Sequence, residues 1–129
     1  MNKDQVLKIL NKLNLPDEEY CILGSSSLVL RGIKDYAKDI DIAITAIGLD
    51  KIKLDYDLKQ IEESKYVLHL QNKEIEFLVK EKENLKYERY DDFLLQDINN
   101  LLQNKEKRGL KKDIKDIAII KAYLERGNA

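Results

Sequence analysis

The segment that most constrains the fold is residues 39–45, with the sequence Asp-Ile-Asp-Ile-Ala-Ile-Thr. Isoleucine at every second position gives the two-residue period of a β-strand with one apolar face, and Asp39 and Asp41 share the opposite face. Aspartate is depleted in strands because its side chain competes with the backbone ladder and its charge resists burial. Two aspartates on one strand face, with α carbons roughly 6 to 7 Å apart, instead suit carboxylates that share divalent cations.

A strand, a glycine–serine turn and a short helix are expected before this segment. The apolar run 20–23 predicts the strand, and Gly24 with the serines at 25–27 predicts the turn. Apolar residues 28–30 and Gly32 predict a helix with a serine cap at its start and a glycine at its end. Glycine allows close backbone approach and serine adds a hydroxyl, so the turn suits an anion. A turn and cap without any ligand is the alternative.

A third acid is expected on a later strand. Two alternating runs, 65–70 and 74–79, flank residues 71–73 and predict a hairpin. The second run places apolar residues on one face and Glu74 and Glu76 on the other. If this strand buries its apolar face against the same helices as residues 39–45, Glu76 joins the two aspartates. Glu74 is the alternative third acid, but it borders the turn and lacks a preceding hydrophobic neighbour, so Glu76 is preferred.

Helical periodicity marks the remaining segments. The first 13 residues predict one helix, a stripe through Leu54, Leu58 and Ile61 predicts another, and the chain beyond Asp91 predicts two more around a basic loop. The expected fold is α/β (α+β): a mixed, mostly antiparallel sheet of four strands, with helices packed on one face and the acids at an open cleft on the other. We expect one domain over residues 1–129, with its core at about 20–80 and a C-terminal helical part at about 91–126.

The charge balance gives no general attraction to polyanions, so any phosphate binding must be local. With 23 basic and 24 acidic residues the formal net charge is −1, so no general field attracts nucleic acid or anionic lipid. No secretory signal and no apolar stretch of about 18 residues is present, so we expect a cytoplasmic protein without membrane association.

Cys21 and His69 are expected to be structural. Asp55 and Asp57 repeat the two-residue spacing in a segment predicted as helix, where such residues diverge, so they are expected to be surface charges.

Three carboxylates on one face repel one another unless cations neutralise them, and Mg²⁺ is the cofactor we expect. A pair of such ions can hold a triphosphate, offset its charge and lower the pKa of an attacking hydroxyl. The third carboxylate can accept the hydroxyl proton, which makes Glu76 the candidate base. The candidate metal ligands and catalytic groups are therefore Asp39, Asp41 and Glu76.

These residues together resemble the nucleotidyltransferase superfamily that includes DNA polymerase beta, and more closely its minimal bacterial branch of the lincosamide and abortive-infection type. The family pattern matches Leu-Gly-Ser at 23–25, a gap of thirteen residues, Asp-Ile-Asp-Ile at 39–42, and Ile-Glu-Phe at 75–77. The resemblance implies an α/β core and Mg²⁺-dependent nucleotidyl transfer. It also implies that Gly24 and Ser25 bind the nucleotide, and that Asp39, Asp41 and Glu76 have the roles given above.

A second stretch extends the resemblance. Several small members of that branch have an Arg-x-Lys-Asp-like motif that opens a final helix, and residues 108–117 look similar, with two extra residues after Arg108. The resemblance implies that Arg108 and Lys112 contact phosphate. The surrounding basic run, 105–112, precedes the last predicted helix, where the macrodipole disfavours cations, so an anionic ligand would explain it. A solvated loop is the alternative for most of these residues.

The function expected from the sequence is Mg²⁺-dependent transfer of a nucleoside monophosphate group from a nucleoside triphosphate to an acceptor. That acceptor is a small molecule such as a drug, an RNA such as tRNA, or a partner protein. One alternative is a member of a toxin–antitoxin pair with this chemistry, and another is a non-catalytic nucleotide-binding or interaction module of the same fold. A domain this small has little room for an acceptor pocket, so a homodimer or partner complex is expected.

Overall fold

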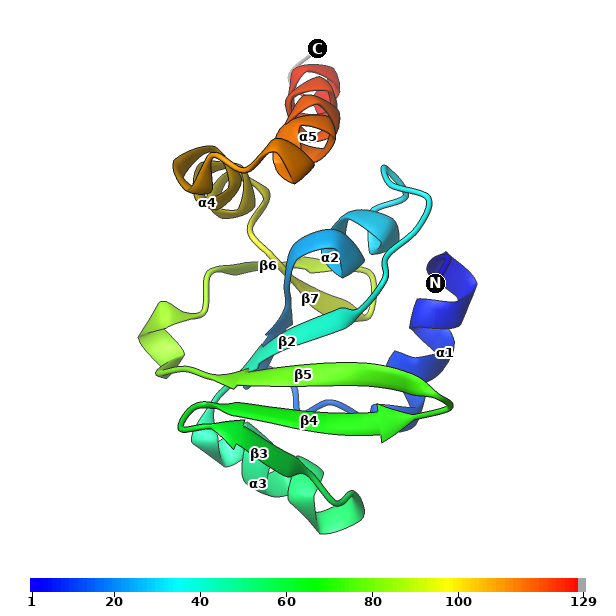
Figure 1. The fold of residues 1–129 in the computed structure, drawn as a ribbon, viewed down its shortest axis with the longest axis vertical. Coiled ribbons are helices and arrows are strands. Elements are labelled where there is room, and N and C mark those ends of the chain that lie inside the picture. Colours follow the sequence, from blue (N-terminus) through cyan, green and yellow to red (C-terminus); the bar gives the residue numbers. More distant parts are fainter. Residues whose placement is uncertain (128–129) are drawn as a thin grey trace.

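A seven-stranded mixed sheet forms the centre of the computed structural model, which describes residues 1–127 (Figure 1). The spatial order is β3-β4-β5-β2-β1-β7-β6. β2 runs parallel to β5 and β1 parallel to β7, and the other neighbouring pairs are antiparallel. The strands are β1 (Tyr20–Ile22), β2 (Ile40–Ile44), β3 (Lys59–Glu62), β4 (Lys65–Leu70), β5 (Lys73–Val79), β6 (Tyr87–Tyr90) and β7 (Phe93–Gln96).

Five α-helices surround the sheet. They are α1 (Lys3–Leu13), α2 (Gly24–Leu30), α3 (Ala46–Asp55), α4 (Ile98–Arg108) and α5 (Ile114–Gly127), with single 3₁₀ turns at Lys82–Asn84 and Lys111–Asp113. The isoleucines of β2 are buried in one cluster with apolar residues of α1, α2 and α3. This cluster is the main core, and it covers the apolar face that the alternation in β2 predicts.

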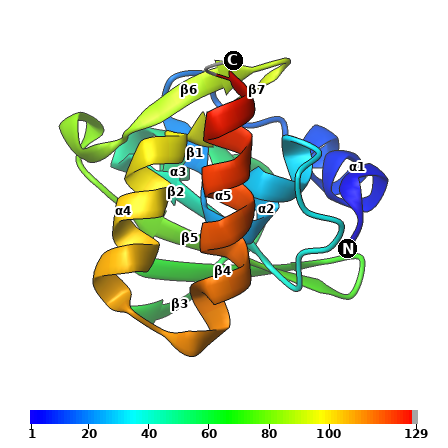
Figure 2. The same cartoon turned by 90° about the horizontal axis from the view of Figure 1, so that it is seen from above.

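The two C-terminal helices are attached through a second, smaller cluster. It joins Leu28 of α2 to Ile98 and Leu101 of α4 and Ile120 of α5. Figure 2 shows α4 and α5 side by side, in front of the sheet. Because these helices pack on α2 rather than on the main core, a space remains between them and the Asp41 side of β2, and the candidate site lies there.

Several predicted elements are confirmed. Helix α1, strands β1 and β2 and helix α2 lie within a residue or two of their expected positions. The predicted hairpin is β4 and β5, joined by Gln71 and Asn72, whose φ angles of 54° and 61° are those of a tight two-residue hairpin turn. Gly32, at φ 76°, follows the end of α2 as expected. No serine caps that helix, however, since its N-cap residue is Leu23 and no side chain accepts there.

Two expectations about the sheet and helices are wrong. The sheet has seven strands rather than four. The stripe through Leu54, Leu58 and Ile61 is not one helix, because α3 ends at Asp55 and the chain continues as the exposed edge strand β3. Leu54 is 83% exposed and so belongs to no buried face.

The predicted C-terminal helical part begins at Ile98 rather than near residue 91, because residues 93–96 form β7. Leu94 and Leu95 are both buried, so this strand lacks the polar–apolar alternation that would distinguish it from a helix in sequence. Within residues 1–127, every helix falls short of the length and apolar content that a membrane crossing requires.

Candidate functional site

Two of the three predicted acids, Asp41 and Glu76, are neighbours in the β2·β5 pair, and the third, Asp39, precedes β2. Asp41 projects from the face of β2 opposite the isoleucines, and the parallel register places Glu76 of β5 directly beside it. Asp39 comes just before the first residue of β2, and its backbone carbonyl accepts a hydrogen bond from Ser26 Oγ at 2.7 Å. Glu74, the alternative third acid, lies opposite His69 near the hairpin turn and is exposed. Strand register therefore favours Glu76 over Glu74 as the neighbour of Asp41.

The carboxylate of Asp41 lies in an unfavourable environment. Burial, together with the neighbouring Glu76 and Asp39 carboxylates, raises the pKa of Asp41 from its ordinary 3.8 to about 6. Its Oδ1 atom is buried and has no hydrogen-bond partner among the described residues. The nearest compensation is Lys65, whose Nζ lies 3.7 Å from Glu76 Oε1. A buried carboxylate oxygen without a donor, beside two further acids, is an arrangement that a cation would stabilise.

The donor set fits Mg²⁺ in chemical kind, since hard divalent cations prefer carboxylate oxygens. Among residues 1–127, no three His, Cys, Asp or Glu side chains are close enough to form a complete metal-ligand group. The two strands fix only the Asp41 and Glu76 backbones as neighbours. Asp39 lies outside the strand, in the connection that leads into it, and its side chain is exposed.

The glycine–serine turn presents fewer free groups than its sequence suggests. Gly24 has φ 54°, a conformation that favours glycine, and its backbone N–H donates to Gln96 Oε1 at 3.0 Å. The second and third serines donate their hydroxyl hydrogens to the backbone carbonyls of Asp39 and Gly24. Ser25 differs, because its Oγ accepts a hydrogen bond from Lys34 Nζ at 2.9 Å. Its own hydroxyl hydrogen is therefore left to donate to a ligand.

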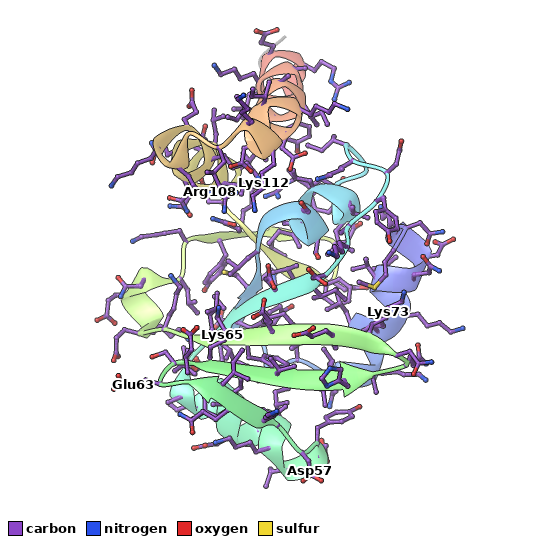
Figure 3. All side chains as sticks on the ribbon, viewed as in Figure 1. Asp57, Glu63, Lys65, Lys73, Arg108 and Lys112 are labelled. Atoms are coloured by element: carbon purple, nitrogen blue, oxygen red, sulfur yellow. The ribbon has the colours of Figure 1, made fainter. Side chains whose placement is uncertain are left out.

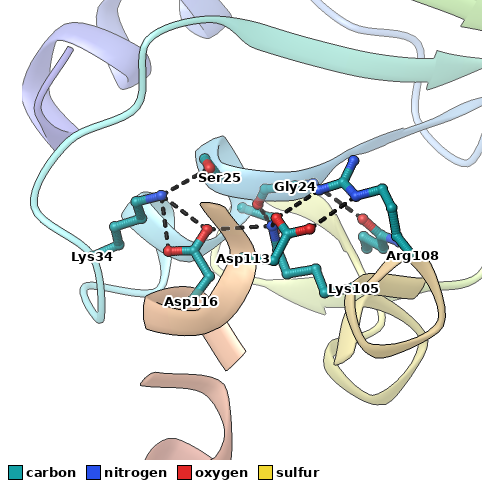
Figure 4. Close-up of polar contacts among 9 residues, drawn as sticks. Gly24, Ser25, Lys34, Lys105, Arg108, Asp113 and Asp116 are labelled. Atoms are coloured by element: carbon teal, nitrogen blue, oxygen red, sulfur yellow. Dashed lines mark hydrogen bonds and ion pairs between the residues drawn. The ribbon is translucent and has the colours of Figure 1, made fainter. Parts of the chain in front are cut away.

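A chain of ion pairs connects this turn to the C-terminal helices (Figure 4). Asp113, 2% exposed, accepts from Arg108 Nε at 2.9 Å, from Arg108 Nη2 at 2.6 Å and from Lys105 Nζ at 3.2 Å. Asp116, 5% exposed, lies 3.2 Å from Lys105 Nζ and 2.9 Å from Lys34 Nζ. The hydrogen bonds from Arg108 lower the pKa of Asp113, and Lys105 adds to that effect. The network orders basic side chains from Arg108 to Ser25.

Two adjoining cavities open beside Asp41. The first, here the Ser25 cavity, has a volume of about 340 Å³, and its walls include Ser25, Lys34, Asp39, Arg108 and Lys112. The second, here the Asn100 cavity, has a volume of about 280 Å³ and lies between the sheet and α4. Both cavities are lined by a shared set of residues, namely Leu23, Gly24, Asp41, Lys105 and Arg108. A ligand that extends from one cavity into the other must therefore pass Asp41.

A comparison with solved structures identifies the fold. A crystal structure from Thermotoga maritima, of a protein described provisionally as a nucleotidyltransferase, matches with a TM-score of 0.62 at 14% sequence identity. The match covers 98% of this chain and 96% of the other. The chain has a nucleotidyltransferase-like fold. No family model and no curated protein matches the sequence.

Within the nucleotidyltransferase-like fold, most predicted site residues lie around the Ser25 cavity. Gly24, Ser25, Asp39, Asp41, Arg108 and Lys112 all line it, whereas Glu76 lines neither cavity. Figure 3 shows Arg108 and Lys112 at the junction of α4 and α5, on the side that faces the sheet. The expected basic loop before the last helix is wrong in part, because residues 105–108 form the last turn of α4, where the macrodipole favours cations.

Other cavity residues were not predicted. Lys34, Lys105, Asp113 and Asp116 form the ion-pair network, and Gln96 binds the turn. One signal was available for the acids: Asp113 and Asp116 are three residues apart at the start of a helix, so they share a face. Lys34 lies 82 residues from Asp116, and no local pattern connects the two.

Proposed function

We propose that this protein is a Mg²⁺-dependent nucleotidyltransferase that moves a nucleoside monophosphate group from a nucleoside triphosphate to an acceptor hydroxyl. One observation carries the proposal: the Asp41 carboxylate, with a buried oxygen that lacks a donor, lies beside Glu76 and on the wall of a cavity rich in cations. Carboxylates for metal and cations for phosphate are the two requirements of phosphoryl chemistry, and here they adjoin.

The triphosphate tail would bind in the Ser25 cavity. Ser25 Oγ accepts a hydrogen bond from Lys34 Nζ, and the hydroxyl hydrogen can be donated to a phosphate oxygen. Lys112 and Lys38 also line the cavity, and neither forms an ion pair within residues 1–127. Arg108 would add a guanidinium donor, with Asp113 fixing its direction. These groups favour an anion over a neutral ligand.

Asp39, Asp41 and Glu76 would hold Mg²⁺, which would neutralise these acids and the phosphates and lower the pKa of the acceptor hydroxyl. In the transfer, the acceptor oxygen forms a bond to the α-phosphorus, and the bond from that phosphorus to the bridging oxygen of the β-phosphate breaks. The products are the nucleotidylated acceptor and pyrophosphate. Glu76 would accept the hydroxyl proton, and the nearby Lys65 ammonium, at 3.7 Å, would stabilise its charged form before transfer.

The test is transfer of label from each α-labelled triphosphate, with Mg²⁺, into cell extract. Wild type should label one class of acceptor, and Asp41→Asn should not. Asp57→Asn is the matched control, because Asp57 is exposed and lines neither cavity. Digestion of the product with ribonuclease or protease would separate RNA, protein and small-molecule acceptors. Equal labelling by wild type and Asp41→Asn would refute the proposed chemistry.

The same experiment separates the alternatives that the sequence left open. A non-catalytic module would bind a triphosphate with Mg²⁺, and so raise the unfolding midpoint, without transferring label. A member of a toxin–antitoxin pair would label a partner encoded beside it, or a tRNA. A buried carboxylate oxygen without a donor destabilises a fold, and the presence of Asp41 Oδ1 beside a cavity lined by cations favours the catalytic proposal over the non-catalytic one.

A further inference from the structure

We infer that the Asn100 cavity is the nucleoside subsite, and that the side-chain amide of Asn100 donates a hydrogen bond to the nucleobase. This inference rests on the proposed function, because it assumes that a triphosphate binds in the neighbouring Ser25 cavity. It adds the part of the site that distinguishes a nucleotide from any other polyphosphate, and it assigns a residue of α4 to that task.

The hydrogen bonds around Gln96 fix which way the Asn100 amide points. A backbone N–H can only donate, so the bond from Gly24 N defines the accepting atom of Gln96 as Oε1. Gln96 Nε2 must then face Asn100, and it donates to Asn100 Oδ1 at 2.9 Å. Asn100 Oδ1 is therefore an acceptor, and Asn100 Nδ2 keeps both its hydrogens for a ligand. The orientation of the amide follows from a backbone group rather than from an assumption about the amide itself.

Gln96 is held firmly enough to transmit this orientation. It is 6% exposed, and its backbone carbonyl accepts a hydrogen bond from the buried Arg31 guanidinium at 2.7 Å. The same side chain binds the glycine–serine turn at one end and Asn100 at the other. Gln96 is thus a positioning residue that connects the two cavities.

The walls of the Asn100 cavity suit a flat ring with a polar edge. Cys21, Ala43 and Leu78 form an apolar floor on the sheet, and Asn100 lies across the cavity on α4. Nucleobases are apolar on their faces and carry hydrogen-bonding groups only at their edges. Burial raises the pKa of the Cys21 thiol to about 12, so this floor is uncharged at neutral pH. The rest of the lining is mostly polar and includes Lys80, Asn84, Lys86 and Asn104, so the cavity offers an apolar floor to a ring and polar walls to its edge.

The position of the cavity distinguishes a nucleoside from an acceptor. The two cavities share Asp41 and Arg108, so a ligand with phosphates in the Ser25 cavity extends past Asp41 into the Asn100 cavity. Glu76, the proposed base, lines neither cavity, and an acceptor hydroxyl that gives its proton to Glu76 approaches from outside both. The nucleoside is the part of the substrate that remains for the Asn100 cavity.

Binding measurements on the full chain test the inference. The probes are inorganic tripolyphosphate and each of ATP, GTP, CTP and UTP, by calorimetry with Mg²⁺, and the readout is the ratio of the tripolyphosphate Kd to the Kd of the best-bound nucleotide. Asn100→Asp keeps an acceptor for Gln96 but removes the donor, and Asn99→Asp makes the same charge change at an exposed position outside both cavities. The ratio should fall about tenfold in Asn100→Asp and stay at the wild-type value in Asn99→Asp.

Asn100→Ala removes the donor without adding charge, and it should lower the ratio as well, with circular dichroism and the unfolding midpoint as checks on the fold. A wild-type ratio near one, or a ratio that neither Asn100 variant changes, would overturn the nucleoside subsite and leave the phosphate site intact. If neither tripolyphosphate nor any nucleotide binds, the proposed function itself fails. The two failures are therefore distinguishable.

Discussion

Replacing Asp41 by asparagine should stabilise the fold at neutral pH while it removes transferase activity. The physical reason is the environment of the carboxylate: Asp41 Oδ1 is buried without a donor, and burial with the neighbouring Glu76 and Asp39 charges raises the pKa of Asp41 from 3.8 to about 6. The charged form of Asp41 therefore destabilises the native state when no ligand is bound. Asparagine has nearly the same shape and no charge, so it removes this destabilisation.

The sign and size of this effect follow from linkage. Because the pKa of Asp41 is higher in the native state, the native state binds more protons between about pH 4 and pH 6, and the free energy of unfolding falls as the pH rises through that window. One pKa unit corresponds to about 1.4 kcal/mol, so a rise from 3.8 to about 6 sets an upper limit of about 3 kcal/mol. Asp41 is partly exposed, and solvent screening reduces the expected effect to about 1–2 kcal/mol.

Urea unfolding in metal-free buffer between pH 4 and pH 8 measures the effect. The stability difference between Asp41→Asn and wild type should be near zero at pH 4 and reach about 1–2 kcal/mol by pH 7. Asp57→Asn, at an exposed position, controls for the loss of one charge. Addition of Mg²⁺ should then stabilise wild type alone and narrow the difference. A difference that stays constant across the pH range would refute the reasoning, since it would mean that Asp41 pays no ionisation cost in the native state.

Three further predictions concern other parts of the fold and site. Asp113→Asn should lower the free energy of unfolding by about 2–3 kcal/mol at pH 7, because the buried Lys105 loses a carboxylate partner. This loss of stability should become smaller as the pH falls through the depressed pKa of Asp113, and urea unfolding at several pH values measures it. Gly48→Ala should cost about 1–3 kcal/mol in thermal unfolding, because its Cβ would lie 2.7 Å from Ile44 Cγ1. Lys34→Met should raise the tripolyphosphate Kd about tenfold in calorimetry, and an unchanged Kd would exclude a contact between Lys34 and the phosphates.

The parts of the fold that sequence predicts well are those with a local cause. The alternation in residues 39–45 requires a strand with Asp39 and Asp41 on one side, and β2 follows it with Asp41 opposite the isoleucines. The tight turn at Gln71 and Asn72 is likewise set by neighbours in sequence. In residues 39–45 the alternation indicates a strand with one solvent-exposed face and one buried face, and such a strand can be recognised from the sequence.

The sequence does not predict a strand that is buried on both faces, or a contact between segments that are far apart in the chain. β7 is covered on both sides, so Leu94 and Leu95 could equally belong to a helix. The parallel register that places Glu76 beside Asp41 connects segments whose order in the sheet no local pattern sets. Lys34 contacts Asp116 across 82 residues, and the apolar cluster shared by α2 and α5 holds the two segments together. Tertiary packing, rather than composition, assembled these contacts.

Three acids that line the Ser25 cavity, Asp41, Asp113 and Asp116, are of two kinds, and their partners separate them. Asp113 and Asp116 are almost fully buried, yet each contacts two cations, so the fold itself accounts for their charge. Asp41 is less buried but has one oxygen without any donor among the described residues, and its nearest charged neighbours are acids. Asp113 and Asp116 orient the basic side chains. Asp41 has no cation of its own among the described residues. A charged ligand with hard oxygen preference is the simplest completion of that site, and the shared cavity wall at Asp41 places it where a triphosphate would pass.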